Sequence, residues 1–243
     1  MNALKTYLYK NKPTAPTPKW ATALLLSSFA LQLALTWNIP NQQGLDTSPG
    51  QAPKQLTTTL LSLGEAPLAS YAMNIYIQTF DSQAQKSLGI RTLDHPAIRQ
   101  WLAQAITINP TSSYALLLAS RVYASAANPV DARKTLEFVH QHFLSSPEQN
   151  WPWLAHAVHV ARYELGDIEL AKRYAKSLAE HGTSPKIPSW AKQLEIFLLE
   201  ANNETEAARQ LLGRLIDSGQ IKDTSELQFL ISRLQQLNAG LSK

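Results

Sequence analysis

The first hydrophobic pattern in the chain is a continuous apolar stretch near its beginning. Residues 20–45 contain no charged side chain, and the apolar stretch runs from Trp20 through Trp37 to Ile39. About 20 helical residues, rising about 1.5 Å each, span the roughly 30 Å hydrocarbon core of a bilayer. The two tryptophans lie at its ends, where indole side chains favour the headgroup region, and Pro40 follows as a helix breaker. The pattern predicts a transmembrane helix over residues 20–39.

The charges around this segment predict its orientation. Four lysines precede it, and the next positive charge is Lys54. Because positive charge is retained on the cytoplasmic side, residues 1–19 are expected to be a basic cytoplasmic tail, and the remainder to lie in the periplasm beyond an inner membrane. A cleaved signal peptide is the alternative, but the stretch is long for one and no small-x-small site follows it. Residues 40–54 hold three prolines and two glycines and predict a flexible linker.

The second pattern is helical periodicity, which continues from residue 55 to the C-terminus. Prolines and glycines fall between apolar-periodic segments, and several segments open with an N-cap residue, as Asn128-Pro129-Val130-Asp131 does. No run of alternating β-branched residues indicates a sheet. Residues 56–93 are expected to form a first helix pair, and residues 223–237 a last helix that caps the array. The predicted fold is therefore all-α, with one helical domain over residues 55–243.

An internal repeat is the most informative feature of this domain. Three helices open with an aromatic residue, and three following helices carry an alanine and then a basic residue. The aromatic positions are Tyr114, Trp153 and Trp190, and the paired positions are Ala132-Arg133, Ala171-Lys172 and Ala208-Arg209. Both sets step by 39 and then by 37 residues, so two independent landmarks share one spacing. The pair Ile98-Arg99 fits the same frame one unit earlier.

This repeat resembles the tetratricopeptide family. The step from Ile98 to Ala132 is 34 residues, Leu165-Gly166-Asp167 matches the family's turn between helices, and Pro110 its closing proline. The small-residue positions are taken by Ala105, Ala132, Ala171 and Ala208, and the aromatic position by Tyr123. The resemblance covers roughly residues 94–218 and implies an α-solenoid of helix hairpins. The steps of 37 and 39 exceed 34 and imply longer loops between units, such as residues 145–150.

The resemblance also implies a concave groove lined by the first helix of each unit. It places there Tyr114, Leu117, Arg121, Trp153, His156, Tyr163, Trp190, Gln193 and Phe197. Aromatic residues and arginine are enriched at binding hot spots, and the mixed apolar and polar character favours a protein or peptide partner. The alternative is that the aromatic residues pack between repeats as core.

Charge argues against nucleic acid as a partner. The chain has 22 basic and 18 acidic residues, and four of the lysines precede residue 20. Subtracting these four from 22 leaves 18 basic residues, so the part from residue 46 onwards has a formal charge of zero. A nucleic-acid-binding domain is usually basic. The absence of cysteine excludes disulfides, thiolate metal sites and a cysteine nucleophile.

No catalytic motif is present, so neither an enzyme nor a cofactor is predicted. His-Glu-x-x-His, Gly-x-Ser-x-Gly, Walker and dinucleotide glycine patterns are all absent. The histidines at 140, 142, 156 and 159 are the nearest approach to a constellation. A zinc site would need His140 and His156 to meet across neighbouring helices, and the alternative is that these histidines are polar residues at helix ends and in the groove.

Together these patterns predict a membrane-tethered protein-interaction or scaffold module. Its expected role is that of an accessory subunit of a bacterial envelope complex, for secretion, pilus or polysaccharide assembly. A periplasmic chaperone that binds peptides is the alternative, and an enzyme or a metal-binding protein a distant one.

Overall fold

The structure is a computed structural model that describes residues 18–37, 48–54, 57–58, 64–87, 92–219 and 221–241. Every regular element within these ranges is a helix, so the all-α prediction is confirmed for this part of the chain. The chain divides into two compact units, Met1–Leu45 and Asp46–Lys243.

The first unit contains α1 (Lys19–Trp37). Its exposed large apolar side chains are Trp20, Leu24, Leu25, Leu26, Phe29, Leu31 and Leu33, and Ser27, Ser28 and Gln32 are interspersed among them. Across the described ranges, no helix combines the length and the apolar character that crossing a membrane requires. The transmembrane helix predicted for residues 20–39 is therefore not found in the described residues. The basic tail lies mostly outside those residues, as do residues 38–47.

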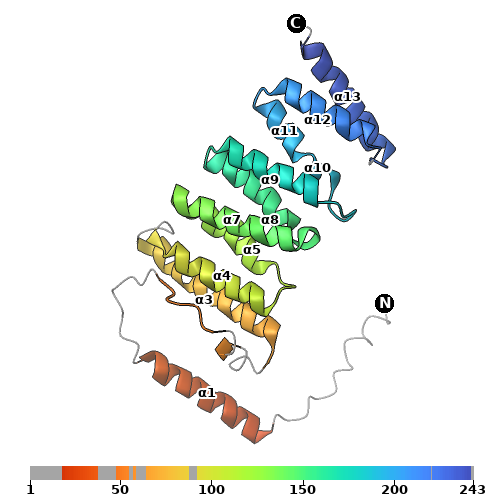
Figure 1. The fold of residues 1–243 in the computed structure, drawn as a ribbon. Helices are drawn as coiled ribbons and strands as arrows, with labels where there is room; N and C mark the ends of the chain where they lie inside the picture. The colour runs from red at the N-terminus through yellow and green to blue at the C-terminus, as the bar shows by residue number, and fades with distance from the viewer. Residues whose placement is uncertain are drawn as a thin grey trace, which may run out of the picture. The chain divides into compact units, whose positions relative to one another are not determined.

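The second unit stacks helix hairpins in chain order (Figure 1). The first helices of the hairpins are α3 (Ala66–Ser87), α5 (Tyr114–Leu118) with η2 (Ala119–Tyr123) and α6 (Ala124–Ala126), α8 (Pro147–His159) with η3 (Val160–Glu164), and α10 (Ser189–Lys192) with α11 (Leu194–Ala201). The second helices are α4 (His95–Ile108), α7 (Pro129–Ser145), α9 (Ile168–His181) and α12 (Thr205–Asp217), and α13 (Thr224–Leu241) packs on α12. The η segments are π-helical turns that continue the preceding α-helix.

The beginning of this unit is described in part. Of residues 56–93, for which the sequence predicts a helix pair, the structure describes the helical residues 57–58 and the long helix α3, which packs against α4. The linker predicted for residues 40–54 ends earlier than expected. The Oγ of Ser48 donates to Asp94 at 2.7 Å, Pro49 is buried, and the Trp101 indole N–H donates to the Gly50 carbonyl at 3.0 Å. Residues 48–50 are thus held against α4.

A side chain at the N-terminal boundary caps each of the helices α4, α7 and α9. Asp94 accepts from the Ala97 backbone N–H at 3.0 Å, and Asp167 accepts from that of Leu170 at 3.1 Å. Asn128 caps α7 in the same way by accepting two backbone N–H bonds. These bonds satisfy donors that the first helical turn leaves without partners. Helix α12 lacks such a bond: Asn203 takes a left-handed φ of 62° in the turn, and Glu204 precedes α12 without a side-chain cap.

The small residues of the repeat lie where helices cross. Ala132, Ala171 and Ala208 are each 0% exposed, and Ile98 is 1% exposed. A methyl side chain lets neighbouring helices approach closely, and a well-packed interior leaves no spare volume beside it. These positions therefore set how closely each second helix sits against its neighbours.

The basic residue that follows three of these positions, Ile98, Ala132 and Ala171, pairs with the next hairpin, whereas Arg209 after Ala208 pairs with Glu206 of its own helix. Arg99 pairs with Asp131 at 3.2 Å, Arg133 pairs with Asp167 at 2.9 Å, and Lys172 pairs with Glu204. Since each acid lies at the start of the following second helix, the pairs link successive hairpins. Exposed ion pairs contribute about 0–1 kcal/mol each, so they define the register of the stack more than its stability.

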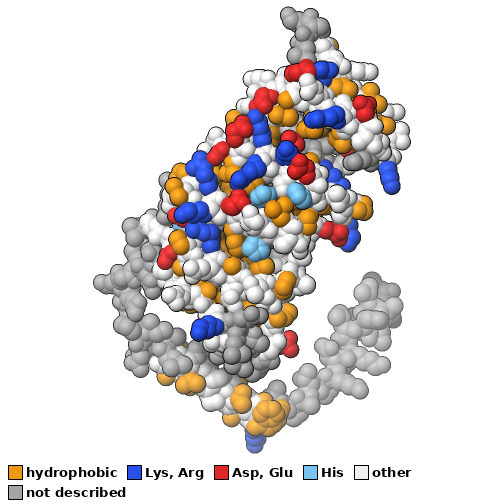
Figure 2. All heavy atoms as spheres, viewed as in Figure 1, with side chains coloured by type: hydrophobic (Ala, Val, Ile, Leu, Met, Phe, Trp, Pro, Cys, Tyr) orange, Lys and Arg blue, Asp and Glu red, His pale blue; other side chains and the backbone are white. Residues whose placement is uncertain are grey.

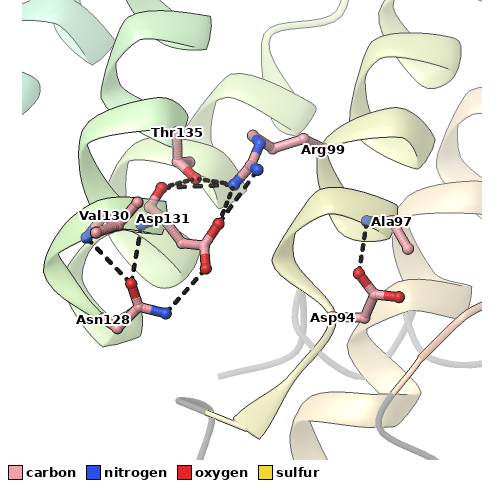
Figure 3. Close-up of polar contacts among 7 residues, drawn as sticks. All are labelled: Asp94, Ala97, Arg99, Asn128, Val130, Asp131 and Thr135. Atoms are coloured by element: carbon pink, nitrogen blue, oxygen red, sulfur yellow. Dashed lines mark hydrogen bonds and ion pairs between the residues drawn. The ribbon is translucent and has the colours of Figure 1, made fainter.

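Figure 3 shows the first of these links. The Arg99 guanidinium reaches the Asp131 carboxylate through two nitrogens, each at 3.2 Å. Asn128 holds the other oxygen of that carboxylate at 2.9 Å, while its own Oδ1 caps α7. The Asp131 carboxylate therefore accepts hydrogen bonds both from Arg99 and from Asn128, the residue that caps α7. Figure 2 shows the wider result, with acidic and basic side chains interspersed over the domain and not gathered by sign.

Replacing Ala171 by leucine tests the close helix crossing. Ala171 is fully buried, and inserting extra carbons into a packed core costs about 1–3 kcal/mol. We expect Ala171→Leu to lower the melting temperature measured by circular dichroism. The matched control is Ala179→Leu, which makes the same change at an exposed position of the same helix. Equal melting temperatures for the two variants would contradict the crossing.

Candidate functional site

Three adjacent hollows, which share lining residues, follow the first helices of the C-terminal hairpins and are together called the groove. Its largest part, about 610 Å³, is lined by Arg121, Trp151, Pro152, Trp153, Ala155, His156, His159, Trp190 and Leu194. A second hollow of about 180 Å³ shares Ala155, His159 and Leu194 with the first and adds Val158, Arg162, Tyr163, Phe197 and Leu198. A third, of about 300 Å³, shares Phe197 with the second and reaches α13 through Phe229, Ser232, Arg233 and Gln236. The groove therefore extends from η2 to α13.

Six of the nine residues predicted for a groove line this one. They are Arg121, Trp153, His156 and Trp190 in its largest part, and Tyr163 and Phe197 in the second hollow. They come from three successive hairpins, as the repeat frame requires.

The other three residues do not line the described hollows, because contacts between hairpins hold them. Gln193 is 5% exposed, and its amide donates to Glu226 of α13 at 2.6 Å. The Tyr114 hydroxyl lies 3.1 Å from the Gln78 amide nitrogen of α3. Leu117 packs against the main hydrophobic core. The sequence predicted that these three residues line the groove, and the structure places them outside the three hollows.

Sequence reasoning missed Trp151, because it began the helix too late, and it considered His159 for the groove only as the alternative to a zinc site. The predicted loop over residues 145–150 is largely helix: α8 begins at Pro147, and Pro152 lies inside it. With the helix begun at Pro147, Trp151, Ala155 and His159 follow one another at intervals of four residues. That spacing puts them on one helix face.

Aromatic rings line the groove in contact with one another. The rings of Trp151 and Trp190 meet edge-on at 5.5 Å and so join two hairpins. The imidazoles of His156 and His159 stack at 5.8 Å with an interplanar angle of 19°, and the ring of Tyr163 lies 4.8 Å from that of His159. Such contacts fix ring orientation, so this surface is pre-organised for a ligand.

Two of the groove's cations lie at unusual backbone positions. Arg121 is the central residue of the π-turn η2, and Arg162 is the central residue of the π-turn η3. These two π-turns are the π-helical segments of the described residues. Such turns are rare and are frequently found at functional sites. The coincidence with both arginines is an independent indication that this surface is a site.

The charged residues that line the groove are all basic. The three described hollows include Arg121, Arg162 and Arg233 and no aspartate or glutamate. Arg233 is neutralised by Glu200, with its Nε 3.0 Å from the carboxylate. The guanidinium of Arg162 lies 4.9 Å from the Tyr163 ring centroid, in a cation–π contact.

The electrostatic environment keeps His156 neutral. Burial lowers its pKa below the usual value, and the nearby positive charge of Arg121 and the neighbouring His159 lower it further, while Glu164 acts in the opposite direction. Glu164 is not among the residues of the described hollows, and its carboxylate accepts a hydrogen bond from Ser125 at 3.2 Å. Near neutral pH His156 is therefore an uncharged member of the groove.

A buried donor in the groove wall has no acceptor. The Nε1 of Trp153 is buried and makes no hydrogen bond among the described residues. The indole and guanidinium groups donate hydrogen bonds and do not accept them. An unsatisfied buried N–H group costs free energy, and this one is enclosed by the protein.

A serine, a histidine and a glutamate also meet, between α7 and α9. The Nε2 of His140 lies 2.9 Å from the Oγ of Ser177, and its Nδ1 lies 3.6 Å from Glu137, which is longer than a hydrogen bond. This order of groups resembles an activated nucleophile. However, Ser177 is only 6% exposed, and Glu137 also binds Arg173 at 2.6 Å. The array links two helices and gives a substrate no approach to the serine.

The histidines do not form a metal site in the described part of the chain. His140 is engaged with Ser177, while His156 stacks on His159. Nowhere in the described ranges do three or more metal-ligating side chains come close enough to hold an ion.

The comparisons with known proteins give no match. No protein-family model matches the chain, and neither the curated proteins nor the solved structures contain one that is similar to it.

Truncating two of the three groove tryptophans, Trp153 and Trp190, tests whether the aromatic residues form a binding surface or core. Trp190 is 51% exposed, so Trp190→Ala should leave the melting temperature nearly unchanged. Trp153 is half-buried and packs against the main core, so Trp153→Ala should lower stability, by less than the about 3–5 kcal/mol of a fully buried tryptophan. Thermal unfolding of both variants by circular dichroism is the measurement. Unfolding of Trp190→Ala would show that the aromatic residues are core.

Proposed function

We propose that the second unit is a tetratricopeptide-like solenoid whose groove binds an extended segment of a partner protein. The observation that carries this proposal is that six predicted groove residues come from three hairpins and line two adjoining hollows: Arg121, Trp153, His156, Tyr163, Trp190 and Phe197. Stacked hairpins with a C-terminal helix on the last one fit a solenoid, in which each unit contacts its neighbours and the end is capped.

The composition of the groove supports a polypeptide ligand. Binding hot spots are enriched in tryptophan, tyrosine and arginine, and the groove contains all three. Its apolar rings can take side chains of the partner, while the indole and guanidinium donors can take backbone carbonyl oxygens. The shared lining residues connect the three hollows, which suits an extended segment better than a compact small molecule.

The proposal also places the domain at a membrane, through its N-terminal segment. Its support is the uncharged sequence of residues 20–45, the four lysines before it and the exposed leucines of α1. Apolar helices next to basic residues associate with bilayers. In this proposal the protein is an accessory subunit of a bacterial envelope complex at the inner membrane, with its helical domain in the periplasm.

Site-specific photo-crosslinking in cells tests the function. A photoreactive residue at position 190, in the full-length chain, should crosslink to one partner in a fixed ratio, because Trp190 lies exposed in the groove. The same residue at position 130, which is 60% exposed on α7, is the matched control. A second change, Phe197→Ala, should reduce the crosslink formed from position 190 and leave any crosslink formed from position 130 unchanged.

Each outcome has a definite meaning. Many unrelated crosslinked proteins would favour a peptide-binding chaperone over a subunit. Equal crosslinking from positions 190 and 130 would contradict groove binding. Recovery of the chain from cells in the soluble fraction, with no membrane-bound pool, would contradict the attachment.

A further inference from the structure

The hydrogen-bonding groups in the groove are complementary to a ligand that brings acceptors. The guanidinium groups of Arg121 and Arg162 can only donate. No carboxylate lines the three described hollows, although the second unit as a whole carries equal numbers of acidic and basic residues. The absence of acids here is therefore local to the groove.

Of the groove's cations, Arg121 and Arg162 are those that a ligand can neutralise. Arg233 is already paired with Glu200, whereas no ion pair joins Arg121 or Arg162 to a described acid. Elsewhere in the domain most arginines do pair with carboxylates, as Arg99, Arg133 and Arg173 do. Guanidinium groups bind carboxylates through paired hydrogen bonds, so a carboxylate is the fitting partner for both.

We propose that the groove recognises an acidic segment of a partner protein, with carboxylates bound by Arg121 and Arg162 and apolar side chains packed against Trp190 and Phe197. This inference rests on the proposed function and specifies its ligand. One hollow contains Arg121 together with tryptophan rings, and the adjoining hollow contains Arg162 together with Tyr163 and Phe197, so each hollow offers contacts for both an acidic and an apolar side chain. The neutral domain disfavours the other polyanion class, single-stranded nucleic acid, whose binding depends on a surplus of positive charge.

Binding of such a segment should be coupled to proton uptake at His156. The charged groups that face this imidazole are Arg121 from η2, His159 from its own helix and Glu164 from η3. In the free groove the two basic neighbours and burial disfavour the protonated ring. A carboxylate bound at Arg121 offsets that positive charge and so favours protonation of His156. Affinity should then rise as pH falls, while glutamate carboxylates stay ionised down to about pH 4.3.

A set of labelled peptides tests the inference on the full-length chain. The probe is a fluorescein-labelled peptide in which phenylalanine and glutamate are separated by serine, and its counterparts carry glutamine or lysine in place of glutamate. Fluorescence anisotropy should give the tightest binding for the glutamate peptide. Arg121→Gln and Arg162→Gln should each weaken it about fivefold, the equivalent of about 1 kcal/mol for one partly exposed charge pair.

The controls use the same substitutions outside the groove. Arg214 is exposed on α12 and is not among the residues of the three hollows, so Arg214→Gln should leave the affinity unchanged. The glutamate peptide should bind more tightly at about pH 5.5 than at about pH 7.5, and His156→Gln should reduce that difference. The control is His181→Gln, at an exposed histidine of α9. This variant should retain the difference in affinity between the two pH values.

The outcomes separate this inference from the function on which it rests. Equal affinity for the glutamate and glutamine peptides would overturn acidic recognition, yet groove crosslinking to a partner would still support the proposed function. Preferential binding of the lysine peptide would also overturn acidic recognition, and so would a failure of all three peptides to bind. Tighter binding of a labelled single-stranded oligonucleotide that weakens in Arg121→Gln would replace the acidic segment by nucleic acid.

Discussion

Close packing at the alanine positions of the second helices is the constraint on which the rest of the structure depends. Ala132, Ala171 and Ala208 are completely buried, and a larger side chain at any of them would hold two helices apart. Their spacing places one second helix after another along the stack. The first helices, joined to them by short loops, then lie side by side and form the groove between their exposed faces.

The ion pairs act on this arrangement in a different way. Arg99, Arg133 and Lys172 each reach an acid at the start of the next second helix. Exposed pairs of this kind add little stability, but a wrong register would leave both charges without partners. The Arg133 guanidinium also holds the pKa of Asp167 below its usual range, so that acid remains ionised while it caps α9. Packing therefore supplies the stability, and the charges select one alignment of the hairpins.

Features encoded by single residues or short spacings could be predicted from the sequence. The caps at Asp94, Asn128 and Asp167 depend on one side chain and the backbone beside it, and the alanine frame depends on one repeated interval. The start of α8 was missed because Pro152 also fits the first position of a helix, and only the packing shows that it lies one turn inside.

Other features of the site depend on contacts between distant segments. Gln193 follows the repeat frame, yet Glu226, 33 residues later, holds it out of the groove. The π-turns that contain Arg121 and Arg162 have no residue-type signal of their own. A one-residue widening of a helix is settled by the packing on all its sides. The repeat frame therefore placed Arg121 in the groove but gave no indication of Arg162.

The short segment at the start of the second unit has a mechanical consequence. Ser48 and Gly50 are bonded to Asp94 and Trp101 of the α4 region, so a pull on the N-terminal side of the domain is first borne by these two bonds. The force is then transmitted to α4, which packs on several other helices, before it reaches the N-terminal end of α3. The domain would therefore resist such a force as a whole, and α3 would not be the first helix to separate.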